Sequence, residues 1–216
     1  MSCAKQSESY RMIAEAVRRK SADIPLWNAE REAALRAEKS QACFFTGHRD
    51  VVGHGDRDAD AVRQALREWL DRQVESMIYQ GFSTFLCGGA RGFDLLAAAA
   101  VLQAKQLYYP NLRLILLLPC REQTRGWDAR DLSLHLAVLE RAEAYYLQET
   151  YDRGCMHRRN RLLVDLSIAG IAYYDTERQR SGTGMTVRYA QSRGTPMLFM
   201  PLGGTPDERG AEEVPS

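Results

Sequence analysis

The sequence predicts an α/β protein: a Rossmann-like three-layer sandwich with a mainly parallel sheet of about six strands and an N-terminal helical extension. From about Ala42 onward, short apolar runs alternate with longer amphipathic segments, which is the pattern of strand–helix units that build a parallel sheet. The apolar run over 112–118 is typical of a central strand buried on both faces. A chain of 216 residues has room for one such domain with an extension.

The individual elements follow from this alternation. Between the apolar runs, apolar residues recur at three- and four-residue spacing, as over 62–78, where Gly81 then fits the position just after a helix end. Pro119 closes the central strand. The expected strands span 42–45, 84–87, 112–118, 144–147, 168–174 and 196–200. The expected helices span 62–78, 95–106, 132–141 and 156–166, with a loop and helix over 181–193.

The domain itself is expected to cover 41–202, between a helical extension and a flexible tail. Residues 1–40 contain two charged helical patterns, whose apolar faces fit packing on the core and equally fit the formation of a homodimer. Residues 203–216 are rich in Gly, Pro and acidic side chains, a composition typical of disorder. The apolar positions of the two helical patterns are Tyr10, Ile13, Val17, Trp27, Ala34 and Leu35.

Composition limits the partners and the compartment. The net charge of +1 argues against a protein whose whole surface binds nucleic acid. Five cysteines without C-x-x-C spacing indicate neither a disulfide framework nor a structural zinc site. The N-terminus lacks the apolar core of a signal peptide, and no apolar stretch is long enough to cross a bilayer. We therefore expect a cytoplasmic protein without membrane contact.

One local basic cluster departs from this balanced charge. It fits the neutralisation of phosphates, and it equally fits a solvated helix face. Its members are Arg153, His157, Arg158, Arg159 and Arg161.

Three glycine-bearing loops follow expected strands. Because the carboxyl ends of parallel strands meet at one edge of a sheet, these loops predict a ligand site there. Glycine lets backbone N–H groups approach a phosphate, and a helix that starts directly afterwards adds unpaired donors. None of the loops matches G-x-G-x-x-G or a P-loop, and each alone also fits a tight strand-to-helix turn. The loops are Thr46-Gly47-His48-Arg49, the segment 88–94, and Ser181-Gly182-Thr183-Gly184-Met185-Thr186.

The loop after the first strand also carries four side chains of metal-binding type, His48, His54, Asp56 and Asp58. Their spacing matches no established set of metal ligands. A solvated loop is the preferred interpretation, and no metal site is expected.

Several of these motifs together resemble a known family. The segment Gly88-Gly89-Ala90-Arg91-Gly92-Phe93-Asp94 is similar to the Gly-x-Ala-Arg-Gly-x-Asp signature of the DprA branch of the SLOG superfamily. With Thr-Gly-His-Arg at 46–49, Arg159-Asn160 followed by Asp165, and Tyr174-Asp175 before the third glycine loop, the region from about 42 to 202 resembles the YpsA-like family. This resemblance implies a Rossmann-like fold of the DprA/LOG type.

The resemblance also implies roles for individual residues. The glycines of the three loops would form a backbone cradle, with Arg49 and Arg91 as charge partners of the ligand. Asp94 opens a helix, so it fits an N-terminal cap at least as well as a ligand contact. Asn160 and Asp175 would read ribose hydroxyls or a base edge, although an Asp after a strand often only starts a turn. The ligand-binding residues expected in all are Thr46, Gly47, His48, Arg49, Gly88, Gly89, Ala90, Arg91, Gly92, Asp94, Asn160, Asp175, Gly182, Thr183 and Gly184.

Three functions are compatible with these residues. The leading hypothesis is the binding or sensing of a nucleotide or nucleotide-derived ligand, such as ADP-ribose, an NAD-like molecule or a nucleoside phosphate. The alternative by analogy with DprA is the binding of single-stranded DNA, through Arg91 and the cluster near Arg158. The low net charge and the lack of an evident run of exposed aromatic residues disfavour that alternative.

The remaining alternative is an enzyme, a nucleoside-phosphate phosphoribohydrolase. Related hydrolases of the LOG type carry Pro-Gly-Gly-x-Gly-Thr-x-x-Glu, whose Glu assists cleavage of the N-glycosidic bond. In the corresponding stretch, 180–188, that position holds Arg188. A cation cannot replace the carboxylate as a general acid or base, so such an enzyme would need another acid, with Asp94 and Asp175 as candidates. The catalytic residues stay unassigned.

Overall fold

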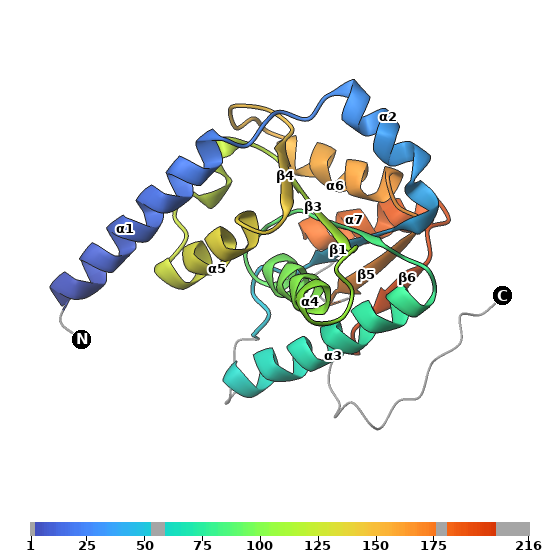
Figure 1. Ribbon diagram of the computed structural model, residues 1–216, viewed down its shortest axis with the longest axis horizontal. Helices are drawn as coiled ribbons and strands as arrows, with labels where there is room; N and C mark the ends of the chain where they lie inside the picture. Colours follow the sequence, from blue (N-terminus) through green and yellow to red (C-terminus); the bar gives the residue numbers. More distant parts are fainter. Residues whose placement is uncertain (1–2, 53–58, 176–180, 202–216) are drawn as a thin grey trace.

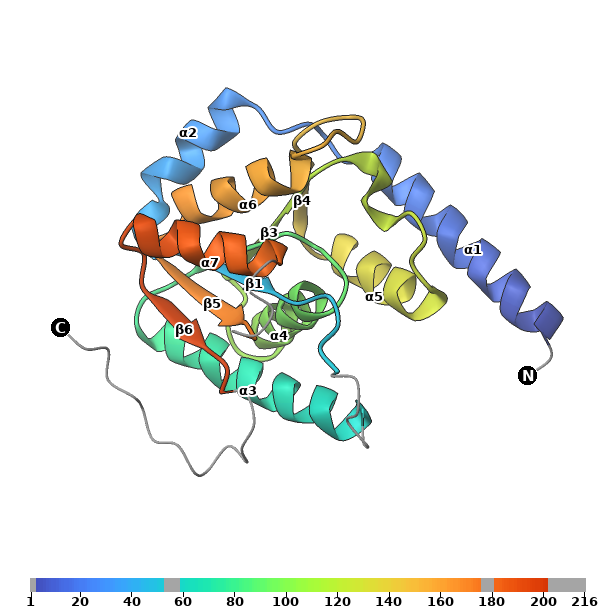
Figure 2. The ribbon, with the colours of Figure 1, turned by 180° about the vertical axis from the view of Figure 1, so that it is seen from behind.

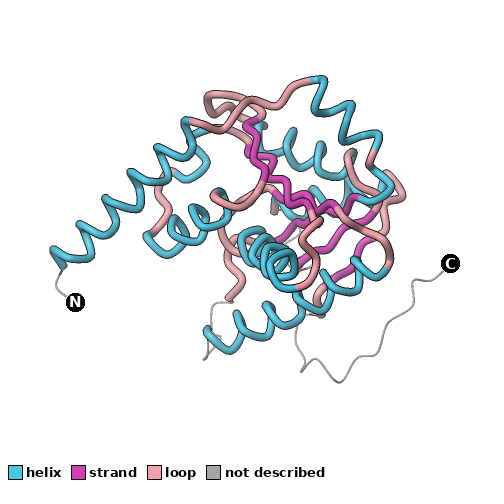
Figure 3. The backbone as a smooth tube through the Cα atoms, viewed as in Figure 1, coloured by secondary structure: helices cyan, strands magenta, loops and turns pink. Residues whose placement is uncertain are grey.

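The structure, a computed structural model, describes residues 3–52, 59–175 and 181–201. Six parallel strands form one sheet in the order β4-β3-β2-β1-β5-β6. Helices cover both faces of this sheet, as Figure 3 shows, and the predicted Rossmann-like α/β class is confirmed. The strands are β1 (Ala42–Gly47), β2 (Thr84–Cys87), β3 (Arg113–Leu118), β4 (Glu143–Tyr146), β5 (Ala169–Tyr173) and β6 (Met197–Phe199).

The order in which successive strands join the sheet reverses at β1. Strands β1 to β4 follow one another outward on one side, and the chain then returns to place β5 on the other side of β1. Cys43 pairs in parallel with Phe85 of β2 and with Ala169 of β5. In open parallel sheets, ligands bind outside the carboxyl ends of the strands at such a reversal. The fold therefore places its expected ligand site beyond the ends of β1 and β5.

Alternate residues of the inner strands enter two separate apolar clusters. Phe45 faces the cluster beneath α3 (Ala59–Tyr79), α4 (Phe93–Leu107) and α5 (Ala129–Leu139). Phe44 faces the cluster beneath α6 (Cys155–Asp165) and α7 (Gly182–Ser192). Side chains of a strand point alternately to opposite faces, so an apolar run such as that of β1 or β3 fills both clusters. Figures 1 and 2 show these two helical layers from opposite sides.

The sequence-based boundaries differ from the structure by a few residues, and one difference bears on the site. Thr46 and Gly47 were expected in a loop, but they belong to β1 because they pair with Ala172 and Tyr173 of β5. A turn motif read from the chain alone could not show this long-range pairing. The short 3₁₀ helix at Arg121–Thr124, which follows β3, was also not predicted.

The N-terminal extension packs on the core, which is one of the two expected arrangements. Helix α1 (Cys3–Ala22) lies against α5, and α2 (Ala29–Ala37) lies on the opposite face, where Leu35 joins the cluster of α6 and α7. Between the two helices, the Trp27 N–H donates to the Tyr146 carbonyl at 2.8 Å, and the Tyr146 N–H donates to the Pro25 carbonyl at 3.0 Å. The connecting segment therefore covers the outer edge of β4 at its carboxyl end. The expected homodimer stays a prediction.

Within the part of the chain that the structure describes, no helix is both long and apolar enough to cross a membrane. The expected cytoplasmic location stays a prediction.

Candidate functional site

A cavity of about 390 Å³ opens at the carboxyl end of β1, at the predicted edge of the sheet. Residues from all three glycine-bearing loops reach it, together with the first turn of α6. Its lining consists of Thr46, Gly47, His48, Arg49, Asp50, Ala90, Asp94, Met156, His157, Arg159, Asn160, Ser181, Gly182 and Thr183.

The first loop is tied to the end of β5 by His48. The His48 N–H donates to the Tyr173 carbonyl at 3.3 Å, and the His48 Nε2 accepts the Asp175 N–H at 2.9 Å. His48 is buried although it contributes to the cavity wall. These bonds hold the loop after β1 and the residue after β5 together across the reversal point.

The second loop is shaped by close contacts behind the cavity. The Arg159 guanidinium lies directly on the Cα of Gly88, where a Cβ would overlap it. Gly92 has φ +81°, and a Cβ at this residue would overlap the Arg49 backbone carbonyl. Both glycines are therefore required by packing, and neither belongs to the residues that line the cavity.

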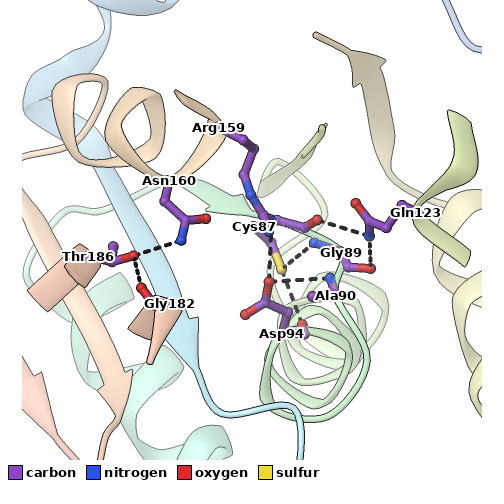
Figure 4. A network of polar contacts seen from close by, with 10 residues as sticks. Cys87, Gly89, Ala90, Asp94, Gln123, Arg159, Asn160, Gly182 and Thr186 are labelled. Carbon is purple, nitrogen blue, oxygen red and sulfur yellow. Dashed lines mark hydrogen bonds and ion pairs between the residues drawn. The ribbon is translucent and has the colours of Figure 1, made fainter. Parts of the chain in front are cut away.

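The polar groups of this second loop are satisfied within the protein. Gln123 Nε2 donates to the Gly88 carbonyl at 3.3 Å and to the Gly89 carbonyl at 2.6 Å. On the other side of the loop, the Ala90 N–H donates to the Asp94 carboxylate at 3.3 Å (Figure 4). The loop thus holds a carboxylate of its own.

A buried ion pair lies next to that carboxylate. Arg159 of α6 is 4% exposed, and its Nη1 lies 3.5 Å from Asp94 Oδ2. Burial raises the pKa of Asp94 and lowers the pKa of Arg159, while the opposite charge of each partner acts against both shifts. Within the described residues, Nε and Nη1 of Arg159 have no hydrogen-bond partner. Since arginine stays protonated in proteins, the wall of the cavity contains an incompletely compensated cation.

The third loop starts α7 and points its amides at the cavity. Ser181 is the N-cap, and its Oγ accepts the Gly184 N–H at 3.0 Å. The N–H groups of Gly182 and Thr183 precede the first intrahelical bond of α7, so they are available as donors. Asn160 Nδ2 donates to Thr186 Oγ1 at 2.7 Å, and that hydroxyl donates to the Gly182 carbonyl at 2.9 Å. Asn160 therefore fixes the first turn of α7 against α6.

The charges of the lining side chains cancel, because Arg49 and Arg159 are matched by Asp50 and Asp94. Arg49 and Asp50 are exposed, whereas Asp94 and Arg159 are buried and pair with each other. The feature that favours an anion is the partial positive charge at the N-terminus of α7, added to the Arg159 cation.

A family model described as YpsA, the YspA SLOG family, matches residues 43–200, which include every wall of this cavity. The chain belongs to the YspA SLOG family. The expected resemblance is thereby confirmed.

Relatives of this SLOG protein include the UPF0398 protein BH1768 of Halalkalibacterium halodurans. It is 26% identical over 134 residues, which make up 61% of this chain and 68% of the relative. The UPF0398 protein YpsA of Bacillus subtilis is 23% identical over 143 residues, or 63% of this chain and 79% of the relative.

Two solved structures of DNA processing protein A share the fold of this SLOG protein. The Helicobacter pylori protein, described for its single-stranded DNA binding mode, has a TM-score of 0.53 at 20% identity. That match covers 79% of this chain and 69% of the other. The Streptococcus pneumoniae protein has a TM-score of 0.55 at 17% identity, with 80% of this chain and 53% of the other covered. At these identities the likeness shows the fold alone.

The structure of this SLOG protein brings most of the predicted site residues together. Those that line the cavity are Thr46, Gly47, His48, Arg49, Ala90, Asp94, Asn160, Gly182 and Thr183. Those outside the lining are Gly88, Gly89, Arg91, Gly92, Asp175 and Gly184. Their contact with a ligand stays a prediction.

Two of the residues outside the lining have other partners. The guanidinium of Arg91 lies 4.0 Å from the Asp131 carboxylate in α5. The backbone of Asp175 bonds His48, as described above. Neither contact requires a ligand.

The basic cluster of the sequence divides in the structure. Arg158 pairs with Asp152 at 2.6 Å, the Arg161 guanidinium lies 5.0 Å from the centre of the Tyr189 ring, and Arg159 is buried in the site. The cluster fitted both a phosphate site and a solvated helix face, and Arg159 was not among the expected ligand-binding residues. The spacing of Cys155, Arg159 and Leu163 on one helix face was the available signal, because all three are buried.

Of the four side chains of metal-binding type in the loop after β1, His54, Asp56 and Asp58 lie outside the residues that the structure describes. Among the residues that the structure does describe, no group of three or more metal-binding side chains occurs.

Proposed function

We propose that this SLOG protein binds a phosphate-bearing nucleotide or nucleotide-derived ligand, such as ADP-ribose, an NAD-like molecule or a nucleoside phosphate. The ligand's phosphate would sit between Arg159 and the first turn of α7. The observation that carries the proposal is that buried Arg159 lines the same cavity as Gly182 and Thr183, the first two residues of α7. A guanidinium and a helix N-terminus together are strong partners for a phosphate.

The size and place of the cavity support a small-molecule ligand. Its volume of about 390 Å³ lies within the range of roughly 300–1,000 Å³ that is common for small-molecule sites. It also lies at the carboxyl end of β1, where the strand order reverses between β1 and β5, which is the usual ligand position in open parallel sheets.

Thermal stability with and without candidate ligands tests the proposal. A ligand present at about one hundred times its Kd should stabilise the protein by about 2.7 kcal/mol. Arg49→Ala removes an exposed cation of the cavity wall, and we expect it to weaken binding about tenfold, since a hydrogen bond to a charged group contributes about 1.5–3 kcal/mol.

Arg19→Ala is the matched control, because Arg19 is an exposed cation on α1, outside the cavity. It should leave the affinity unchanged. The absence of any shift with ADP-ribose, NAD, nucleoside monophosphates and pyrophosphate would contradict the proposal. Analysis of the same mixtures for free base tests the hydrolase alternative.

Single-stranded DNA is a second candidate ligand, favoured by the likeness to DNA processing protein A. Two arginines that it would use, half-buried Arg91 and exposed Arg158, are engaged with Asp131 and Asp152. If DNA binds by neutralising several phosphates, its affinity should fall steeply with salt concentration. A nucleotide held by one or two contacts in the cavity should show a much smaller dependence.

A further inference from the structure

The second glycine loop already contains an anion. Asp94 is 6% exposed, and its carboxylate accepts the Ala90 N–H at 3.3 Å and lies 3.5 Å from Arg159 Nη1. A ligand phosphate at this loop would bind the same two partners, a backbone amide and the guanidinium. Figure 4 shows Asp94 between Ala90 and Arg159.

Gln123 fixes the direction of the loop's peptide groups. Its Nε2 donates to the carbonyls of Gly88 and Gly89, from the side away from Asp94. In a trans peptide the C=O and the following N–H point in opposite directions. The N–H groups of Gly89 and Ala90 are therefore turned toward Cys87 Sγ and the Asp94 carboxylate, at 3.4 Å and 3.3 Å.

Asp94 compensates Arg159 only in part. The 3.5 Å separation is an ion pair, yet Nε and Nη1 of Arg159 still have no hydrogen-bond partner among the described residues. Arg49 is close enough to act electrostatically on both members of the pair. Arg159 thus has one internal anion at ion-pair distance, and both side chains line the cavity.

We propose that Asp94 competes with the ligand's phosphate for Arg159, so that a phosphate group occupies the site only when the rest of the ligand adds contacts of its own. This inference rests on the proposed function. In the empty cavity Asp94 holds Arg159 in place. An incoming phosphate must exceed that interaction, which a nucleotide achieves by adding contacts from its sugar and base. Inorganic phosphate or pyrophosphate has only the ionic contact and binds poorly.

Titration calorimetry with pyrophosphate and with ADP-ribose tests this inference. Asp94→Asn keeps the shape and an acceptor oxygen for the Ala90 N–H, but it removes the charge. We expect it to tighten the binding of pyrophosphate and of ADP-ribose by a similar factor, at least tenfold, because the competing charge opposes the phosphate of both ligands. Asp23→Asn is the matched control, because it removes an exposed carboxylate outside the cavity, and it should change either affinity less than threefold.

Asp94→Ser, which also offers an acceptor to the Ala90 N–H, is a second variant for the case that Asp94→Asn does not fold. Circular dichroism shows whether each variant is folded. If neither variant folds, Asp94 is needed for the structure and the inference is overturned. Weaker ADP-ribose binding with unchanged pyrophosphate binding would show that Asp94 holds a ligand hydroxyl, which also overturns it. If the wild-type protein binds both ligands and Asp94→Asn binds them equally well, this inference is overturned but the proposed function is not. If neither the wild-type protein nor any variant binds a ligand, the proposed function itself is overturned.

Discussion

His135 is a buried histidine that pairs with no carboxylate among the residues the structure describes. It lies in α5 with its ring 5.2 Å from that of Trp127, and burial lowers its pKa to about 4. In an unfolded chain the imidazole titrates near 6.5. Between these two pKa values the unfolded state binds more protons than the folded state, so stability is full above pH 6.5 and is lost as the pH falls toward 4.

We therefore expect wild-type protein to lose about 2 kcal/mol more stability than His135→Phe when the pH falls from 7 to 5, since each pH unit below 6.5 contributes about 1.4 kcal/mol. Urea denaturation at both pH values measures the difference. His157→Phe, at an exposed histidine of the cavity rim, should keep the wild-type dependence on pH. Equal losses in wild type and His135→Phe would contradict the prediction.

At the scale of elements, a comparison of two glycine turns distinguishes the cost of backbone strain from the cost of steric overlap. Gly92 and Gly126 have similar positive φ, +81° and +77°. A Cβ at Gly92 would overlap the Arg49 carbonyl, whereas nothing lies within 4 Å of a Cβ at Gly126. The start of α4 is thus packed against the loop that carries Arg49.

Gly126→Ala should cost about 1–2 kcal/mol, the usual strain of a left-handed residue with a side chain. Gly92→Ala should cost more and should also weaken ligand binding, because Arg49 must move. Thermal denaturation together with a ligand titration measures both effects. Equal destabilisation by the two substitutions would exclude the steric contribution.

Two helix caps offer a similar comparison. Ser181 caps α7 at the cavity, and Asp128 caps α5 through a 2.8 Å bond to the Asp131 N–H, outside the lining. Substitution of either by Ala should destabilise the protein by about 1 kcal/mol. Only Ser181→Ala should reduce the affinity for a phosphate, since it disturbs the amides of Gly182 and Thr183. A reduction of the same size in both variants would argue against an anion site at α7.

The sequence predicted the elements better than it predicted the orientation of site residues. The apolar stripe of α3 was predicted because Leu66, Leu70 and Met77 recur at helical spacing, and all three are buried. Periodicity shows which face of a helix is buried but not which element covers it. For that reason the basic cluster fitted both a phosphate site and a solvated helix face, and the burial of Arg159 could not be predicted.

At the scale of the whole molecule, Arg121 joins the extension to the sheet. It donates from Nη1 and Nη2 to the carbonyls of Ser21 and Ile24, pairs with Glu149, and lies 4.9 Å from the centre of the Tyr146 ring. Four contacts from one side chain thus connect α1, the β4 edge and the loop after it.

Arg121→Ala should accelerate hydrogen exchange in residues 12–27 while the inner strands keep their protection. Arg141→Ala is the control, because it removes hydrogen bonds to Leu102 and Gln106 and leaves the extension untouched. Mass spectrometry of exchanged peptides measures the effect. The prediction is wrong if both variants expose the same peptides.

The covering of β4 by residues 25–27 leaves the two borders of the sheet unlike each other. At the opposite border, β6 has no further strand beside it among the described residues, and Leu198 and Phe199 are 40% and 43% exposed. Open strand borders are sites where chains can join through main-chain hydrogen bonds. At the β4 border, residues 25–27 already bond the outward main-chain groups of Tyr146, so a second chain that joined there would first have to displace them.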